Sequence, residues 1–231
     1  MNLLAAFQFL TALPIRSSSP DSGRAAVWFP LVGAFLGLLA AAVCTALPTQ
    51  GPLLALSLLA LVTGGLHEDG LADVCDALRA YRPREKMFAI LHDSSIGAHG
   101  ATALIFSILI RWQALAHIHN GLWLKLPIAF ALSRAAMVLV AASLPATGAG
   151  LGRHFRDTLP RDAALLVALQ TAALAAFLNW PLAGFVLVAQ AVALALVARW
   201  FYLRLGGCTG DCLGFACHVS EAVSLVMMAA L

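Results

Sequence analysis

Four of the eleven acidic residues of this chain fall within ten positions, in the stretch H-E-D-G-L-A-D-V-C-D from His67 to Asp76. On a helix, Asp69, Asp73 and Asp76 stand at positions i, i+4 and i+7, so their carboxylates share one face. Like charges this close repel one another, and Mg²⁺ is a common counter-ion because it takes oxygen ligands together with water and substrate phosphates. The spacing predicts Asp69, Asp73 and Asp76 as magnesium ligands, with His67 and Glu68 at the head of the stretch binding substrate. The alternative is a solvated acidic helix face.

A second polar motif, H-D-S-S-I-G-A-H-G, runs from His92 to Gly100 and leads into an apolar segment. Its glycines let backbone approach a ligand closely, and N–H groups at the start of a helix favour anions. We therefore expect Asp93 to take part in catalysis, and Ser94 and Gly97 to contact substrate. The alternative is that Asp93 or Ser94 only caps the following helix.

A glycine-rich stretch, G-G-C-T-G-D-C-L-G, occupies residues 206–214. Glycines and an aspartate before a helix are typical of an anion-binding loop, although the pattern is neither a Walker loop nor a dinucleotide fingerprint. We predict that Gly207, Thr209 and Gly210 contact phosphate oxygens. Asp211 is predicted to bind the metal or to take part in catalysis, and the alternative is that it only caps the helix.

Ionisable residues also occur inside the apolar segments, notably Arg134 and Glu221. A charge at bilayer depth is costly, so such a residue is by default a functional candidate. We predict that both side chains contribute to substrate binding, with Glu221 reaching the metal site. The alternative is a structural ion pair between two helices.

The elements that position these residues are expected to be membrane helices. The chain has 231 residues, 61% of them hydrophobic and only 11% charged, where a soluble domain carries about 25% charged residues. Its mean hydropathy is +0.90. The sequence predicts one domain over residues 1–231, an all-α polytopic membrane bundle of about seven spans, some short or broken, around one site. The apolar segment 1–14 has no leading basic region, so we expect it to be retained. The expected spans are 27–47, 53–66, 96–116, 122–144, 162–179, 181–199 and 213–231, and the expected long loop is 145–161.

The positive-inside rule orients this layout. With the N-terminus inside, segments 67–95, 145–161 and 200–212 share one side of the membrane. That side then holds eleven of the fourteen basic residues, which is a bias strong enough to set orientation. We expect an inner-membrane protein whose site faces the cytoplasm. The eleven residues are Arg16, Arg24, Arg79, Arg82, Arg84, Lys86, Arg153, Arg156, Arg161, Arg199 and Arg204.

Carboxylates, a glycine loop and basic residues at one membrane face favour metal-assisted phosphoryl transfer, in which the protein positions groups and offsets developing charge. The three motifs, in this order, resemble those of the cobalamin synthase family, the adenosylcobinamide-GDP ribazoletransferases. The opening F-L-T-A-L-P and the F-P-L-V-G at residues 29–33 agree as well. The resemblance extends over nearly the whole chain, and the motifs together are specific to the family.

The resemblance implies a polytopic enzyme that joins α-ribazole, or its phosphate, to adenosylcobinamide-GDP and releases GMP, with Mg²⁺ required. It implies that Asp69, Asp73 and Asp76 hold Mg²⁺ against the diphosphate, and that Asp93 and Asp211 complete the metal or substrate site. Catalytic residues are expected among Asp73, Asp76, Asp93 and Asp211, with the general base left open. Membrane lipid is an expected partner and nucleic acid is not, while homo-oligomerisation is left open.

Two positions depart from the family pattern: Ser95 stands where arginine is usual, and His218 where glutamate is common. Either the bond to phosphate that an arginine would make at position 95 is missing, or Arg79, Arg82 or Arg84 supplies it. Two other functions stay open on sequence alone. One is a membrane transferase acting on a prenyl or alcohol diphosphate, and the other is an ion-coupled transporter, whose acids would lie near the bilayer midplane.

Overall fold

The computed structural model describes residues 2–16, 21–78, 83–148 and 150–231. Every regular element in these ranges is a helix, and one isolated bridge pairs Ala146 with Cys208. The all-α prediction is confirmed. The elements are α1 (Asn2–Leu10), α2 (Ser22–Ala25), η1 (Ala26–Trp28), α3 (Phe29–Ala46), α4 (Gly51–Thr63), α5 (Leu66–Ala77), α6 (Arg84–Leu91), α7 (Ala98–His117), α8 (Leu122–Ser143), α9 (Leu151–Thr158), α10 (Ala163–Ala175), α11 (Trp180–Leu205) and α12 (Gly210–Ala230).

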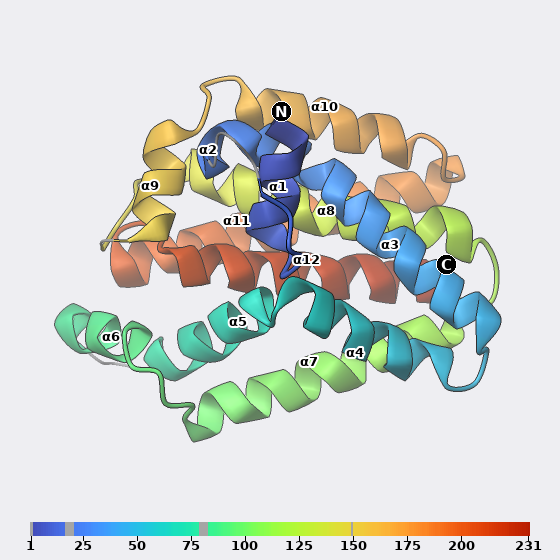
Figure 1. The fold of residues 1–231 in the computed structure, drawn as a ribbon, viewed down its shortest axis with the longest axis horizontal. Coiled ribbons are helices and arrows are strands. Elements are labelled where there is room, and N and C mark those ends of the chain that lie inside the picture. Colours follow the sequence, from blue (N-terminus) through green and yellow to red (C-terminus); the bar gives the residue numbers. More distant parts are fainter. Residues whose placement is uncertain (1, 17–20, 79–82, 149) are drawn as a thin grey trace.

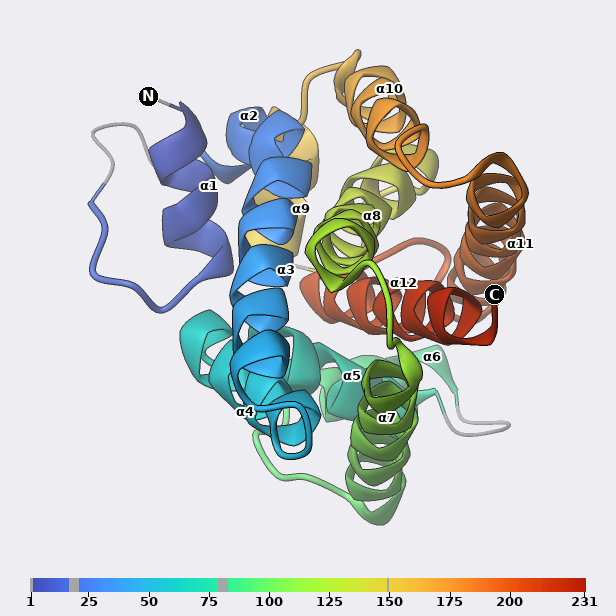
Figure 2. The same cartoon turned by 90° about the vertical axis from the view of Figure 1, so that its right-hand side faces the viewer.

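Helix α8 is the centre of the bundle, packed among α3, α10 and α12 (Figure 2). Two glycines one turn apart on α3 let its backbone touch α8 directly. A Cβ on Gly33 would overlap the carbonyl oxygen of Phe130, and a Cβ on Gly37 would lie 2.5 Å from that of Leu126. Small residues at this four-residue spacing are how membrane helices approach closely, since lipid supplies no hydrophobic drive between them.

Four helical segments are long and apolar enough to span a membrane: Ser22–Ala46, α8, α11 and α12. Helices α4 and α5 form a fifth candidate only as a pair, bent by 91° at the break between them. These findings support a multi-pass membrane protein, but they do not confirm seven spans. Helices α4 and α10 have 13 residues each, about 20 Å, which is short of the roughly 30 Å hydrocarbon layer.

The outward faces of the bundle are apolar, as expected for helices in lipid. On α11, Val188 and Leu196 are 64% and 63% exposed, and on α7, Ile105 and Phe106 are each 59% exposed. Helix α7 has 20 residues but is not among the candidate spans, because Arg111 and other polar residues lower its hydropathy.

The segments predicted to share one side of the membrane do gather at one end of the bundle (Figure 1). The backbone N–H of Cys208 donates to Pro145 at 3.0 Å, and that of Thr147 donates to Cys208 at 2.9 Å. The guanidinium of Arg84 donates to the carbonyl of Arg204 at 3.4 Å. The turns α3–α4 and α7–α8 and the C-terminus lie at the other end (Figure 1). Which end faces the cytoplasm stays a prediction.

One loop prediction was wrong, since segment 145–161 contains α9. The sequence of α9 is mostly polar and short, and an isolated helix of eight residues is marginal in water. Tertiary packing holds it: Phe155 is 1% exposed and stacks on Phe9 and Phe29, with ring centroids 5.8 and 5.6 Å apart.

Candidate functional site

Helix α5 carries the acidic stretch, and Asp69, Asp73 and Asp76 stand on it at the predicted spacing. It begins after Gly64 and Gly65, whose φ angles of 64° and 70° lie in the left-handed region that favours glycine. This pair of glycines produces the sharp bend between α4 and α5. The bend points the start of α5 into the bundle rather than continuing along α4 (Figure 1).

A close crossing with α12 brings the third motif to the acidic helix. A Cβ on Gly70 would lie 2.7 Å from the carbonyl oxygen of Asp211, and a Cβ on Gly214 would lie 3.3 Å from the Cα of Gly70. Only glycine at these two positions lets the helices approach so closely. The first turn of α12, with Asp211, therefore lies against the acidic face of α5.

A cavity of about 640 Å³ opens beside α5, between the end of α1, the α4–α5 bend and the entry into α7. We call it the acidic cavity. Four predicted site residues line it: Glu68, Asp69, Asp73 and Ser94. Its other lining residues are Phe9, Thr11, Ala12, Thr63, Gly64, Gly65, Leu66, Ala72, Ile96 and Leu104.

A second cavity of about 350 Å³ lies on the other side of Asp69, which lines both. We call it the aromatic cavity. Predicted site residues in its wall are His67, Asp69, Gly210 and Asp211. The remaining wall is formed by Gln8, Phe9, Leu66, Met137, Gly152, Phe155, Leu213 and Gly214.

Asp76 is directed away from both cavities. Its carboxylate accepts a hydrogen bond of 2.7 Å from the backbone N–H of Gly97, the residue before α7. A Cβ on either Gly97 or Gly100 would overlap this carboxylate. Asp76 therefore holds the start of α7 against α5, and Gly97, predicted to contact substrate, contacts Asp76.

Asp93 is exposed and organises its own turn. Its Oδ1 accepts a 3.0 Å hydrogen bond from the backbone N–H of Ser95 and another from the Ser95 hydroxyl. These bonds hold the pKa of the Asp93 carboxyl below its ordinary value. Asp93 does not line the acidic cavity, whereas its neighbour Ser94 does.

Some residues of the glycine-rich stretch stabilise the loop itself, and others line the aromatic cavity. Gly206 has φ +76°, and a Cβ on Gly207 would overlap the carbonyl oxygen of Pro145. Thr209 caps α12, because its hydroxyl accepts from the backbone N–H of Cys212 at 3.4 Å and lies 3.2 Å from the Asp211 carboxylate. Gly207 and Thr209 thus fix the loop, and Gly210 and Asp211 reach the aromatic cavity.

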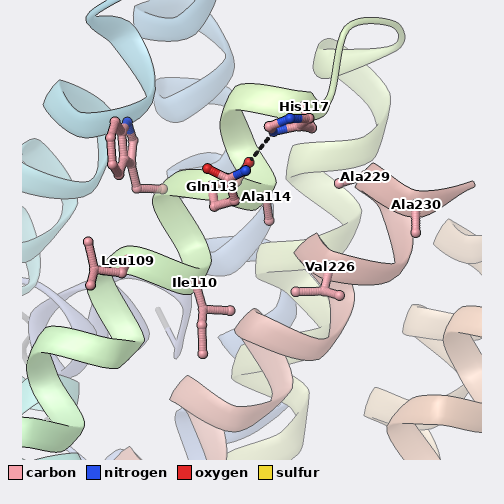
Figure 3. A pocket seen from close by; sticks show the side chains of 9 residues that line it. Leu109, Ile110, Gln113, Ala114, His117, Val226, Ala229 and Ala230 are labelled. Carbon is pink, nitrogen blue, oxygen red and sulfur yellow. Dashed lines mark hydrogen bonds between the residues drawn. The ribbon is translucent and has the colours of Figure 1, made fainter.

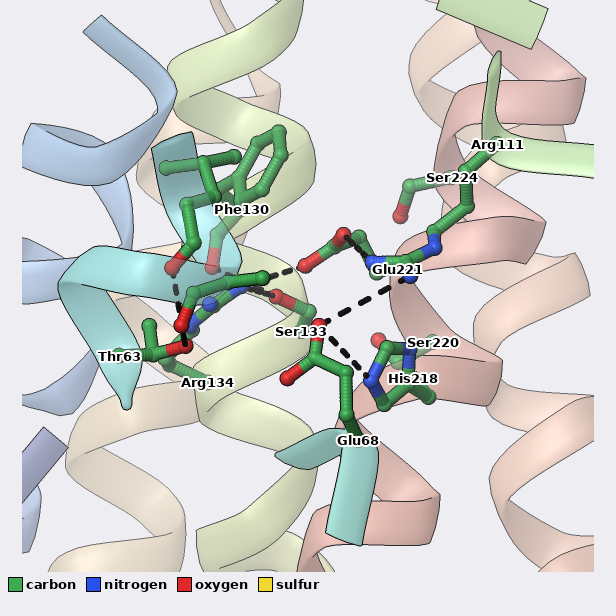
Figure 4. A network of polar contacts seen from close by, with 12 residues as sticks. Thr63, Glu68, Arg111, Phe130, Ser133, Arg134, His218, Ser220, Glu221 and Ser224 are labelled. Atoms are coloured by element: carbon green, nitrogen blue, oxygen red, sulfur yellow. Dashed lines mark hydrogen bonds and ion pairs between the residues drawn. The ribbon is translucent and has the colours of Figure 1, made fainter. Parts of the chain in front are cut away.

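Arg134 and Glu221 do pair, inside a buried network that joins four helices (Figure 4). Arg134 on α8 and Arg111 on α7 donate to the two carboxylate oxygens of Glu221, at 2.6 and 2.9 Å. Glu68 on α5 lies 3.9 Å from Arg111 and 3.5 Å from the ring of His218. The ion pair that the sequence offered as an alternative is therefore present, and Glu68 connects it to the acidic cavity.

Sequence analysis did not include Arg111 in the site, although it obeys the same rule that singled out Arg134, a charge inside an apolar helix. It also missed Phe9 and Phe155, for which an apolar sequence gives no distinguishing signal. Of the three arginines offered as substitutes at Ser95, Arg79 and Arg82 lie outside the described residues, and Arg84 donates to the carbonyl of Arg204.

The residues present fit a magnesium ion only with help from substrate. Within the described ranges, no group of three or more His, Cys, Asp or Glu side chains is arranged to hold a metal. Mg²⁺, however, is commonly held by one or two carboxylates together with water and phosphate oxygens. Asp69 and Asp73 line one cavity, and neither forms a salt bridge with any described residue. The three-aspartate ligand set stays a prediction.

A further cavity, of about 580 Å³, lies between α7 and α12 near the C-terminus (Figure 3). Its wall is almost entirely apolar, with Leu109, Ile110 and Val226 among its residues, and it contains no carboxylate. His117 contacts the carbonyl of Gln113 there at 2.8 Å. This cavity offers nothing to a diphosphate, so the acidic and aromatic cavities are the candidate site.

Comparison with known proteins gives one consistent result. The model of a family described as cobalamin-5-phosphate synthase matches residues 2–229. A protein of Geotalea daltonii is 36% identical over 98% of this chain and 96% of its own length. Proteins of Bradyrhizobium diazoefficiens and Pseudomonas aeruginosa are each 37% identical over 99% of this chain and 93% and 97% of theirs.

All three relatives are named adenosylcobinamide-GDP ribazoletransferase. No solved structure matches the chain. The family match covers nearly every residue, including all three motifs and both cavities. This chain belongs to the cobalamin-5-phosphate synthase family.

Proposed function

We propose that this protein is an adenosylcobinamide-GDP ribazoletransferase, which joins α-ribazole or its phosphate to adenosylcobinamide-GDP and releases GMP. The observation that carries the proposal is the near full-length likeness to relatives of that name. The structure supports the proposal with a site suited to a divalent cation that would bind a diphosphate: Asp69 and Asp73 line an open cavity without a cationic partner among the described residues.

The proposed reaction is a substitution at phosphorus. An oxygen of a ribazole hydroxyl forms a bond to the phosphorus that carries cobinamide. The bond between that phosphorus and the bridging oxygen breaks, GMP leaves with that oxygen, and the hydroxyl proton passes to a base. Carboxylates suit this role because they accept a proton within hydrogen-bond reach of a bound hydroxyl. Among the four aspartates expected to be catalytic, Asp73 and Asp211 line the cavities. Because we assign Asp73 to the metal, Asp211 is the candidate for the base.

Magnesium, when bound, would neutralise diphosphate charge. We assign its protein ligands to Asp69 and Asp73, since both reach the acidic cavity. Asp76 is assigned a supporting role through Gly97, because its carboxylate holds the entry into α7. Arg134 and Glu221 are likewise assigned to positioning α5, because both are buried and bound to each other.

We also propose that the end bearing α6 and α9 faces the cytoplasm of a cell whose inner membrane holds the protein. Eleven of the fourteen basic residues belong to segments predicted for that side, which supports this orientation. The substrates would then reach the acidic cavity from the compartment in which nucleotides are made.

The test uses purified protein in detergent, supplied with adenosylcobinamide-GDP, α-ribazole phosphate and Mg²⁺, with GMP and the joined corrinoid measured together. Asp73→Asn should abolish both products while the protein still accumulates and unfolds at a normal temperature. Asp162→Asn, at an exposed aspartate before α10, is the matched control and should retain full turnover. Normal turnover by Asp73→Asn would overturn the role of Asp73. Turnover of a prenyl diphosphate, with none of adenosylcobinamide-GDP, would overturn the function.

A further inference from the structure

The two cavities of the site meet along a shared wall. Phe9, Leu66 and Asp69 line both of them, so the two cavities adjoin at these three residues. A transferase that joins two substrates needs this arrangement, since the attacking oxygen and the phosphorus must be within about 3.5 Å of each other. The question is which substrate each cavity takes.

The walls of the two cavities differ in chemistry. The acidic cavity presents Glu68, Asp69 and Asp73, side chains suited to a cation and a diphosphate. The aromatic cavity is formed mainly by apolar groups. Phe9 and Leu66 present apolar surface to it, whereas Phe155 and Met137 in the same wall are only 1% and 3% exposed. Flat apolar rings bind well against aromatic and aliphatic surface of this kind.

Two carboxylates give the aromatic cavity its polar groups. Asp69 and Asp211 line its wall, and carboxylate oxygens accept hydrogen bonds from hydroxyl groups. His67 also borders this cavity, but its ring is 3% exposed and the residue lines the small void beside Arg134 and Glu221 as well.

The volume of the aromatic cavity also indicates which substrate it can take. The aromatic cavity, at about 350 Å³, is at the lower end of the roughly 300–1,000 Å³ typical of small-molecule sites. A corrin ring with its side chains cannot enter it, but a bicyclic base with a ribose is of the right size. Of the corrinoid substrate, only the diphosphate arm can reach the shared wall.

We propose that the aromatic cavity is the acceptor subsite: it takes the flat base of α-ribazole against its apolar wall at Phe9 and Leu66, and its ribose near Asp211. The diphosphate of the other substrate occupies the acidic cavity. This assignment rests on the proposed function, and it adds which residues select the nucleoside.

Gly210 gives a direct way to fill the subsite. It lines the aromatic cavity only, and a Cβ built there would lie 3.7 Å from the nearest atom, the backbone nitrogen of Gly152. Gly210→Ala should therefore fold, and its methyl group should occupy space needed by the nucleoside. Gly184→Ala is the matched control: it is also a helical glycine, its Cβ would meet nothing within 4 Å, and it lines neither cavity.

Gly210→Ala should raise the KM for α-ribazole phosphate by about tenfold, the usual effect of one unaccommodated methyl group, and leave the KM for adenosylcobinamide-GDP within about twofold. Gly210→Val should raise the acceptor KM further. Gln8→Ala, at an exposed residue in the same wall, should raise the same KM. Ile96→Ala, confined to the acidic cavity, should raise the KM for the corrinoid alone.

Equilibrium dialysis of α-ribazole against the purified protein, without corrinoid, gives a readout independent of turnover. Binding should weaken in Gly210→Ala and stay unchanged in Gly184→Ala. Suppose that the wild-type protein turns over both substrates. If Gly210→Ala and Gln8→Ala then leave the KM for α-ribazole phosphate unaltered, or raise the KM for the corrinoid equally, the subsite assignment is overturned while the proposed function stands. If the unchanged protein turns over neither substrate, the proposed function itself fails.

Discussion

Glu221→Gln is the substitution that most directly tests how the site is held. Glu221 is 3% exposed and receives Arg134 and Arg111 on its two carboxylate oxygens, at 2.6 and 2.9 Å. With Glu68 beside Arg111, the buried group contains two positive and two negative side chains. Glutamine preserves the shape of Glu221 but removes one negative charge, so the group is left with an uncompensated positive charge among four helices.

The expected cost follows from these distances. At an effective dielectric constant of about 20, unit charges 2.9 Å apart attract by about 6 kcal/mol, and desolvation and the hydrogen bond kept by glutamine offset part of the loss. Breaking a buried pair at one partner generally costs about 3–5 kcal/mol. For a chain of this length each kcal/mol lowers the unfolding temperature by about 2–4 °C, so Glu221→Gln should lower it by roughly 6–20 °C.

Thermal unfolding of the purified protein in detergent measures this shift. Glu85→Gln, at an exposed glutamate of α6, is the matched control and should change the unfolding temperature very little. The double variant Arg134→Met, Glu221→Gln restores neutrality, so its loss should be smaller than the sum of the two single losses by about 1–3 kcal/mol. If Glu221→Gln were no less stable than Glu85→Gln, or if the double variant were additive, the charge-balance argument would be wrong.

Two further predictions concern the crossing of α5 with α12 and the turn before α7. Gly70→Ala must push α5 away from α12, because its methyl group would lie 2.7 Å from the Asp211 carbonyl oxygen. The substitution should lower the free energy of unfolding by about 1–3 kcal/mol and reduce turnover. Gly184→Ala, the control, should do neither. Ser95→Ala removes one of the two hydrogen bonds that lower the pKa of Asp93, so that pKa should move up toward its ordinary value in an NMR titration. Because the folded pKa of Asp93 is depressed, its contribution to stability is present at neutral pH and is lost as pH falls through that pKa; an unchanged titration in Ser95→Ala would contradict this origin.

Local pattern was enough to predict the acidic helix. The spacing of Asp69, Asp73 and Asp76 is a property of ten consecutive residues, and those residues do form one helix, α5. What the spacing could not reveal is that Asp76 is turned to Gly97, 21 residues later, while the other two aspartates line a cavity. A shared face on an isolated helix becomes divided once a second helix packs against one edge of it.

For a related reason, the sequence predicted more membrane spans than the lengths and hydropathy of the helices support. Apolar composition marks segments 53–66 and 162–179 as membrane candidates, and both are helical in part. Their helices end after 13 residues, α4 at Gly64 in the left-handed conformation, and hydropathy carries no information about such a bend. The family resemblance led us to expect Asp211 near the acidic helix, but local sequence does not show what permits the approach, which is the contact between Gly70 and Gly214, 144 positions apart.

The buried network also explains why the aspartates are available to a cation. Two arginines lie in the core near α5, and either could have neutralised the acidic stretch. They are instead neutralised by Glu221 and Glu68. Consecutive residues on a helix point about 100° apart, so Glu68 can face the network while Asp69 faces the cavities. Glu68 thus anchors α5 and pairs with Arg111, and Asp69 and Asp73 keep their negative charge without a cationic partner among the described residues, so they can bind a cation.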